Sequence, residues 1–180
     1  MTAAQDGTAV APIRVCFVCT GNICRSPSAE VVLRTRLAEA GWADRVVVDS
    51  AGTGPWHAGK DMDPRARQAL SRRGYPVPAH VAKQFQAADF AGRELVIALD
   101  AGHLAKLGQL ARLADDPAEA AASLSLLRSH DPAAVAAGEL EVADPYYDGE
   151  AEFETALSEI EAACAGLAHL IGRQLDGSRH

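Results

Sequence analysis

The sequence predicts a single α/β domain of three layers, in which helices cover both faces of a four-stranded parallel sheet. Short apolar, β-branched stretches alternate along the chain with longer segments of helical periodicity, as in repeated strand–helix units. The strand candidates are apolar throughout, which is typical of strands buried on both faces. A length of 180 residues favours one domain with its own core, and we find no internal repeat or interdomain linker.

The first predicted unit is a strand, a tight loop and a helix. Residues 13–19, IRVCFVC, form a continuous apolar run that predicts a buried strand. Ser26 followed by Pro27 predicts a helix start, with serine as the N-cap and proline at the first helical position. Gly41 is the expected end of this helix. Its apolar face consists of Ala29, Val32, Leu33 and Leu37.

The rest of the chain continues this alternation. Further buried strands are predicted at 45–50, 94–100 and 124–127, and helices at 64–74, 101–113 and 149–175. The stretch 51–63, rich in glycine and proline, is predicted to be a loop, and 114–123 and 131–143 to be helix or loop. We expect a flavodoxin-like strand order of 2-1-3-4. The domain is expected to span 13–175, with flexible tails at 1–12 and 176–180.

The charge and the cysteine content limit the classes of protein to which the chain could belong. The chain carries 17 basic and 24 acidic residues, a net charge of −7, which argues against nucleic-acid binding. Its four cysteines are spaced unlike a secreted disulfide framework, so we expect reduced thiols and a cytoplasmic location. Residues 1–12 lack the features of a secretory signal, and the apolar runs are too short to span a bilayer, so no membrane association is expected.

The loop CTGNICRS, residues 19–26, has the features of a phosphate cradle. It lies at the carboxyl end of a parallel strand and opens a helix, where backbone N–H groups and the helix dipole favour an anion. Gly21 permits close approach of the backbone, and Asn22 tolerates a left-handed conformation. Arg25 adds a planar fork of donors that suits phosphate oxygens. The P-loop pattern GxxxxGK[ST] is absent.

Cys19 gives this loop its chemistry. A thiol among inward-facing amides, beside Arg25 and at a helix N-terminus, is expected to be largely ionised and able to attack phosphorus. The Ser26 hydroxyl either caps the helix or bonds the thiolate. Attack on a phosphomonoester also needs a proton donor for the leaving oxygen, and Asp144, which precedes a proline and so lies on a loop, is the candidate.

Together, these motifs resemble the low-molecular-weight protein-tyrosine phosphatase family. The likeness covers residues 13–175 and rests on CTGNICRS, on DPYYDGEAEFE at 144–154, and on the shorter stretches DSAGT, WHAG and HVAKQF between them. The resemblance implies Cys19 as nucleophile, Arg25 as transition-state clamp and Asp144 as acid and then base. The phosphate-binding loop would comprise Thr20, Gly21, Asn22, Ile23, Cys24 and Arg25, held in shape by Asn22, Ser26, Ser50 and His80.

The resemblance also sets expectations for substrates. Trp56 and Tyr146, with Tyr147 beside them, are expected to form aromatic walls around a phenyl ring. The predicted reaction hydrolyses tyrosine-phosphorylated proteins and aryl phosphates, releases inorganic phosphate, and needs no metal or cofactor. A phosphoarginine phosphatase remains an alternative, although Ile23 favours phosphotyrosine because phosphoarginine phosphatases tend to have threonine there. We expect a monomer or weak dimer.

Three other classes of protein are alternatives to a phosphatase. A thiol-dependent arsenate reductase would need relay cysteines, and there are none between Cys24 and Cys164. A phosphoprotein-binding module without catalysis would be expected to lack one of the three catalytic residues. A flavin or nucleotide binder would need a different phosphate loop. Cys19 and Cys24 are close enough in sequence for a reversible protective disulfide. Cys16 and Cys19 form a CxxC motif, which by itself is only a weak indication of a redox pair or a zinc site.

Overall fold

The computed structural model describes residues 11–177, and its architecture is the predicted one. Four parallel strands form one sheet in the order β2-β1-β3-β4. They are β1 (Ile13–Cys19), β2 (Val46–Gly52), β3 (Leu95–Ala98) and β4 (Leu124–Leu126). Because the chain moves from β1 to β2 on one side and then to β3 on the other, the order reverses beside β1, where ligands bind in open parallel sheets.

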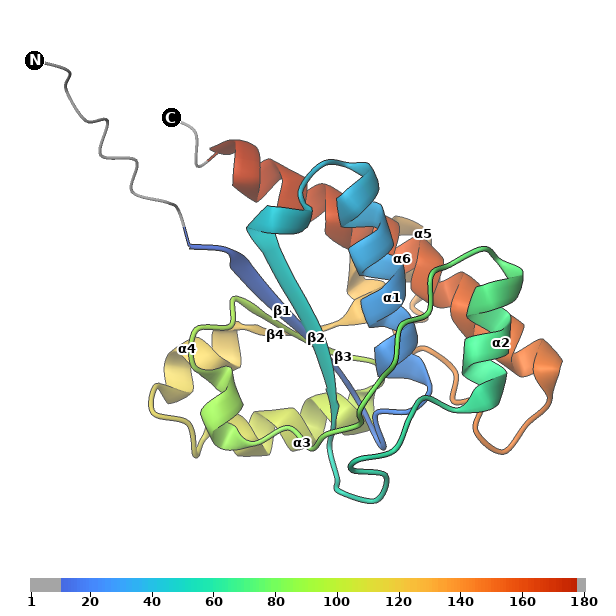
Figure 1. The fold of residues 1–180 in the computed structure, drawn as a ribbon. Coiled ribbons are helices and arrows are strands. Elements are labelled where there is room, and N and C mark those ends of the chain that lie inside the picture. The colour runs from blue at the N-terminus through green and yellow to red at the C-terminus, as the bar shows by residue number, and fades with distance from the viewer. Residues whose placement is uncertain (1–10, 178–180) are drawn as a thin grey trace, which may run out of the picture.

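Helices cover both faces of the sheet (Figure 1). One layer contains α1 (Arg25–Glu39), α2 (Pro64–Arg72) and α6 (Glu150–Gly177), and the other contains α3 (Ala101–Ala111) and α4 (Pro117–Ala122). The helix α5 (Pro132–Ala137) and three short 3₁₀ turns, Ala43–Arg45, Ala87–Phe90 and Leu127–His130, complete the elements of the described residues.

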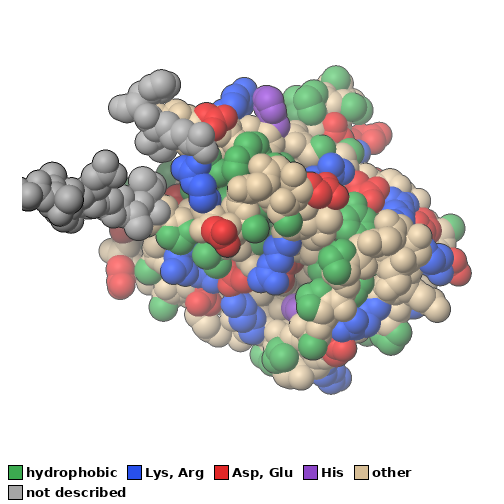
Figure 2. Space-filling model, turned by 45° about the horizontal axis from the view of Figure 1, so that its top comes forward, with side chains coloured by type: hydrophobic (Ala, Val, Ile, Leu, Met, Phe, Trp, Pro, Cys, Tyr) green, Lys and Arg blue, Asp and Glu red, His purple; other side chains and the backbone are tan. Residues whose placement is uncertain are grey.

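Alternating side chains of β1 form the two halves of the core. Val15 and Phe17 pack toward α1 and α6, whereas Cys16 and Val18 pack toward α3, and all four are fully buried. This alternation follows from the two-residue period of a strand, and it explains why the strand is apolar throughout. Charged side chains of both signs are interspersed over the surface seen in Figure 2.

The helix boundaries contain one correction that concerns function. The helix α1 begins at Arg25 with Cys24 as its N-cap, so the prediction of Ser26 as N-cap was wrong. Ser26 lies inside the first turn, and its hydroxyl is engaged by the preceding loop and by the Ala51 carbonyl of β2 instead of by the helix amides. The predicted ends at Gly41 and Gly74 are confirmed, because both residues have the left-handed backbone conformation just beyond α1 and α2.

The predicted tails lie mostly outside the described residues. A flexible segment was predicted at 1–12, and of these residues the structure describes only 11 and 12. At the other end α6 continues to Gly177, two residues past the expected domain end at 175, and 178–180 lie outside the described part of the chain.

We expect Leu167→Ala to destabilise the domain strongly. Leu167 is fully buried in the layer where α6 packs on α1. Truncating a buried leucine removes apolar contacts and leaves a cavity, which costs about 2–5 kcal/mol of unfolding free energy. Urea denaturation measures the loss. Leu113→Ala, at a leucine that is 74% exposed, is the control, and equal effects of the two variants would contradict the packing described.

Candidate phosphate-binding active site

The loop between β1 and α1 curls around the floor of a pocket of about 380 Å³. The pocket is lined by Cys19, Thr20, Gly21, Ile23, Cys24, Arg25, Trp56, His57, Asp144, Tyr146 and Tyr147. The structure thus brings together all of the residues predicted from sequence to contact the phosphate or the substrate ring. The remaining predicted residues, Asn22, Ser26, Ser50 and His80, lie behind the loop.

Asn22 fixes the curl of the loop. Among the described residues other than glycine, Asn22 alone has a positive φ, which is 58°, and its side chain is fully buried. Its amide nitrogen donates to Ser26 Oγ and to Ser50 Oγ, each at 2.9 Å. Its amide oxygen accepts from the Lys83 backbone N–H at 3.0 Å, and its carbonyl contacts His80 Nε2 at 2.7 Å. A strained conformation is therefore held from three sides.

Close packing behind the loop requires a glycine at position 52. A Cβ there would lie 2.7 Å from the Thr20 carbonyl oxygen and 3.1 Å from the Gly21 carbonyl carbon. Gly52 ends β2, and the backbone N–H of the next residue, Thr53, donates to the Cys19 carbonyl at 2.8 Å. The catalytic loop therefore rests directly on the end of the neighbouring strand, with no room for a side chain between them.

Cys19 lies at the base of the pocket, 3% exposed, with its sulfur 3.0 Å from Ser26 Oγ. The Ser26 hydroxyl also receives the Asn22 amide and lies 3.2 Å from the Ala51 carbonyl. Of the two roles open to Ser26 in the sequence, the structure favours the contact with the nucleophile. By turning its single proton from the Ala51 carbonyl to the sulfur, a hydroxyl at this distance would donate to a thiolate and stabilise it.

Arg25 spans the pocket from the first residue of α1. It is 4% exposed, and its Nη1 donates to Asp100 Oδ2 at 2.9 Å and to the Val142 carbonyl at 3.0 Å. Its Nη2 lies 3.2 Å from Asp144 Oδ2. The guanidinium is therefore oriented by two groups behind it while its other side faces the pocket and the predicted acid.

Asp144 and the tyrosines reach the same pocket from the loop before α6. One oxygen of Asp144 accepts the Tyr146 backbone N–H at 3.1 Å, and its side chain is 48% exposed. The rings of Tyr146 and Tyr147 meet edge to face, with centroids 4.9 Å apart. Of the predicted aromatic walls, Trp56 is 59% exposed, and Tyr147 beside them is 90% exposed, so these two form an open rim of the pocket.

Arg65 fastens this loop to α2. Its guanidinium pairs with Asp63 and donates to the backbone carbonyls of Tyr146, at 2.9 Å, and Asp148, at 3.2 Å. It also lies over the Phe153 ring, 4.7 Å from the centroid. The segment that carries the predicted acid is therefore held by a residue from another helix.

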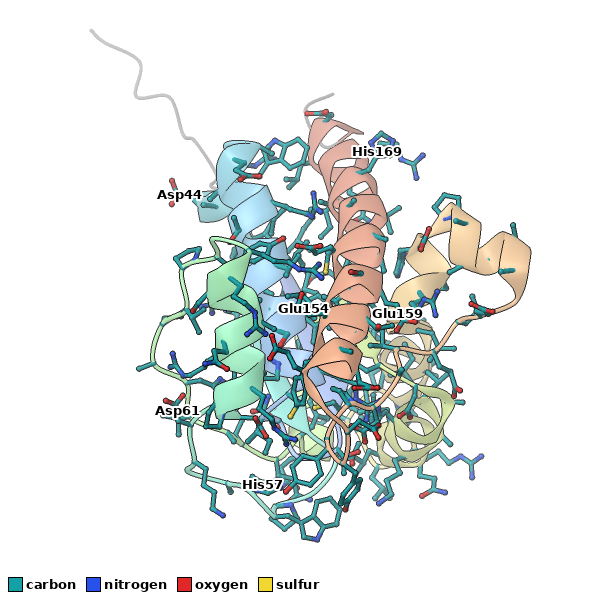
Figure 3. The ribbon with its side chains drawn as sticks, turned by 90° about the vertical axis from the view of Figure 1, so that its right-hand side faces the viewer. Asp44, His57, Asp61, Glu154, Glu159 and His169 are labelled. Carbon is teal, nitrogen blue, oxygen red and sulfur yellow. The ribbon has the colours of Figure 1, made fainter. Side chains whose placement is uncertain are left out.

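Several site residues were missed by sequence reasoning. His57 lines the pocket beside Tyr146, with ring centroids 6.1 Å apart, and lies close over Gly21. Figure 3 shows it at the opposite end of the molecule from His169. Asp100 holds Arg25, and Arg65 holds the acid loop. Asp100 had a usable signal, because it ends the predicted strand 94–100, at the same sheet edge as Cys19. His57 belongs to the WHAG stretch of the resemblance, but its contacts, like those of Arg65, arise only in the folded chain.

Cys24 is a protonated thiol at rest. Burial, followed by the nearby Asp63 carboxylate and Cys19, raises its pKa well above the ordinary range. Cys19 and Cys24 are both free thiols in the structure, and the reversible disulfide between them stays a prediction. The cysteines Cys16 and Cys164 are fully buried in the core.

The described part of the chain contains neither a candidate metal-binding cluster nor a candidate membrane-spanning helix. Among residues 11–177, no group of three or more His, Cys, Asp or Glu side chains is arranged to hold a metal ion. None of the helices in this region combines the length and the apolar character needed to cross a membrane.

The fold and the site define an α/β protein with a cysteine–arginine anion loop at the switch point of its sheet. The family model for low molecular weight phosphotyrosine protein phosphatase matches residues 14–177. A relative named low molecular weight protein-tyrosine-phosphatase, from Streptomyces coelicolor, is 52% identical over 164 residues, which are 91% of this chain and 96% of the relative. The chain belongs to the low molecular weight phosphotyrosine protein phosphatase family.

Solved structures agree with this assignment. A protein tyrosine phosphatase from Entamoeba histolytica has a TM-score of 0.80 and 29% identity, and the match covers 92% of this chain and 99% of that one. A Drosophila arginine phosphatase has a TM-score of 0.79 and 28% identity, with coverage of 88% and 98%. The fold is thus shared by proteins named for two different phosphorylated side chains.

We expect Asn22→Ala to weaken phosphate binding at least ~10-fold, because both the left-handed conformation and the side-chain bonds that hold the loop are lost. Asn22→Gly separates the two effects: glycine restores the backbone conformation but not the bonds. Competitive inhibition by inorganic phosphate measures both variants. Wild-type affinity in Asn22→Ala would show that the loop keeps its shape without Asn22.

Proposed function

We propose that this protein hydrolyses phosphotyrosine in proteins, and small aryl phosphates, through a phosphocysteine intermediate on Cys19. The observation that carries the proposal is the convergence of three groups on one pocket. The Cys19 sulfur lies at its base, and Arg25 Nη2 and Asp144 Oδ2 lie 3.2 Å apart above the loop. Nucleophile, phosphate clamp and proton donor therefore face the same small volume, as phosphoryl transfer requires.

The first step forms a phosphorus–sulfur bond. The Cys19 thiolate attacks phosphorus, the bond from phosphorus to the tyrosine oxygen breaks, and Asp144 gives its proton to that oxygen. The loop amides and Arg25 stabilise the equatorial oxygens. A phosphoryl group bound here offers Arg25 oxygens of its own, in competition with its contact to Asp144.

The second step releases phosphate. Asp144, now ionised, accepts a proton from water as the water oxygen attacks phosphorus, and the phosphorus–sulfur bond breaks. The electron pair returns to the Cys19 sulfur. Ser26 Oγ lies 3.0 Å from this sulfur and stabilises it as a leaving thiolate. The steps use only side chains of the pocket and water, and inorganic phosphate is the product.

We infer a cytoplasmic role in signalling through phosphorylated proteins. The four cysteines are all free thiols, which suits a reducing compartment. The open rim at Trp56 and Tyr147 suits a side chain presented on a protein surface. We further propose a monomer or weak dimer.

We expect Cys19→Ser to lower turnover of p-nitrophenyl phosphate by roughly 10⁴-fold or more, since the nucleophile is lost, while binding of inorganic phosphate persists. Turnover with EDTA present and inhibition by vanadate complete the test. The control is Cys164→Ser, which changes a thiol in the core away from the pocket and should leave kcat unchanged. Retained hydrolysis in Cys19→Ser would exclude the covalent route.

Phosphoarginine is the second candidate substrate, because the Drosophila arginine phosphatase shares the fold. Here Ile23 and Tyr146 contribute apolar surface beside the loop, which favours a phenyl ring over a guanidinium group. In a side-by-side assay, we expect kcat/KM for phosphotyrosine to exceed that for phosphoarginine by at least ~10-fold, the scale on which an apolar pocket discriminates. The reverse preference would reassign the substrate.

A further inference from the structure

His103 is a buried, titratable residue below the catalytic loop that the proposed mechanism does not use. It occupies the first turn of α3, and its side chain is 5% exposed. Its backbone N–H donates at 2.9 Å to Asp100 Oδ1, the side chain that caps this helix. Because Asp100 comes two residues after the end of β3, the helix start places the His103 ring at the edge of the sheet where the phosphate loop lies.

Both ring nitrogens of His103 face groups connected to the site. Nε2 lies 2.8 Å from Thr20 Oγ1, on the residue that follows the nucleophile. Nδ1 lies 3.2 Å from Asp100 Oδ1, an electrostatic contact without the alignment of a full hydrogen bond, and it has no other polar partner among the described residues. The ring therefore bridges the phosphate loop and the carboxylate that holds Arg25.

The surroundings determine which nitrogen carries the proton. Burial lowers the pKa of His103 to about 4, against the opposing effect of Asp100, so the ring is neutral and holds one proton. A lone pair on Nδ1 would face the Asp100 carboxylate and be repelled, which assigns the proton to Nδ1. Nε2 is then an acceptor, and the Thr20 hydroxyl must donate to it.

The result is a continuous chain of contacts, Thr20–His103–Asp100–Arg25. It joins the first residue of the loop to the arginine at its far end, through two residues of another strand–helix unit. Although burial by itself would raise the pKa of Asp100, the His103 amide and the nearby Arg25 side chain hold it below its ordinary value, so this carboxylate stays ionised. One charge thus orients both the guanidinium and the ring.

We propose that His103 is a positioning residue for phosphoryl transfer, holding the Thr20 hydroxyl directly and the Arg25 guanidinium through Asp100. This inference rests on the proposed function. His103 touches neither phosphate nor the leaving group. It acts by fixing the width of the loop between its two ends, so that the amides and Arg25 match the equatorial oxygens of the transition state.

The test is a double-mutant cycle with Thr20→Val and His103→Leu. Each single variant is expected to lower kcat/KM for p-nitrophenyl phosphate by roughly 10-fold to 100-fold, and the double variant by no more than the worse single one, because both remove the same contact. Losses that multiply, or singles within twofold of wild type, would overturn the proposal. Thr20 is exposed, so Thr20→Val keeps the test open if His103→Leu fails to fold.

A structural defect is separated from a positioning defect by inhibitor affinity. We expect the Ki of vanadate to rise in His103→Leu along with the loss of kcat/KM, whereas a partly unfolded enzyme would lose kcat with an unchanged Ki. His130→Leu is the control, since the half-buried His130 ring also lies beside a hydroxyl, Ser125 Oγ at 3.2 Å, but outside the pocket lining. An equal rise of Ki in His130→Leu would contradict a specific role for His103.

Two further measurements complete this test of His103. His103→Gln, which retains a polar group at about the reach of Nε2, should recover most of the activity, and failure to recover it in a folded variant would count against the bond to Thr20. The His103→Leu loss should be equal for phenyl and p-nitrophenyl phosphate, because the acid is untouched, whereas Asp144→Asn should lose more on the poorer leaving group. If the wild type hydrolyses neither ester, the proposed function fails, and calorimetry with inorganic phosphate still compares the variants.

Discussion

The left-handed backbone of Asn22 is the constraint on which the active-site geometry depends. An L-residue in this conformation costs roughly 1–2 kcal/mol, and asparagine is among the residues that adopt it most readily. The fully buried side chain offsets the cost with bonds to Ser26, Ser50 and the Lys83 amide. Because the chain reverses at this residue, the loop closes around a single volume, with the nucleophile at one end and Arg25 at the other.

The bonds that hold Asn22 extend into the fold. Ser50 belongs to β2, and its hydroxyl donates to Glu30 of α1 at 2.6 Å. His80 and Lys83 come from the segment between α2 and β3, which is anchored to the end of β2 by the isolated bridge of Gly52 with Gln84. The shape of the loop is therefore set by the packing of the helix, the strand and the connecting segment, and short-range sequence alone does not specify it.

This division explains what could be predicted from the sequence. The strands and the phosphate loop were predictable, because apolar runs and the loop motif are local patterns, and Cys19 and Arg25 belong to that motif. The strand order was predictable only through the flavodoxin-like topology expected for this alternation of strands and helices. The N-cap at Ser26 was wrong, since the loop residues Cys19 and Asn22 and the Ala51 carbonyl of β2 engage its hydroxyl. Asp100 and His103 were missed because their importance comes from contacts across the sheet edge, with residues 75 and 83 positions away.

The placement of the acid on the last loop has a consequence for biosynthesis. Cys19 is synthesised well before Asp144 and before the helix α6, which completes the support of the acid loop. Arg65 can hold the loop of Asp144 only after that loop has been made. A growing chain therefore contains the nucleophile before it contains the proton donor, and catalytic competence has to wait for the segment that carries Asp144 and for the docking of α6.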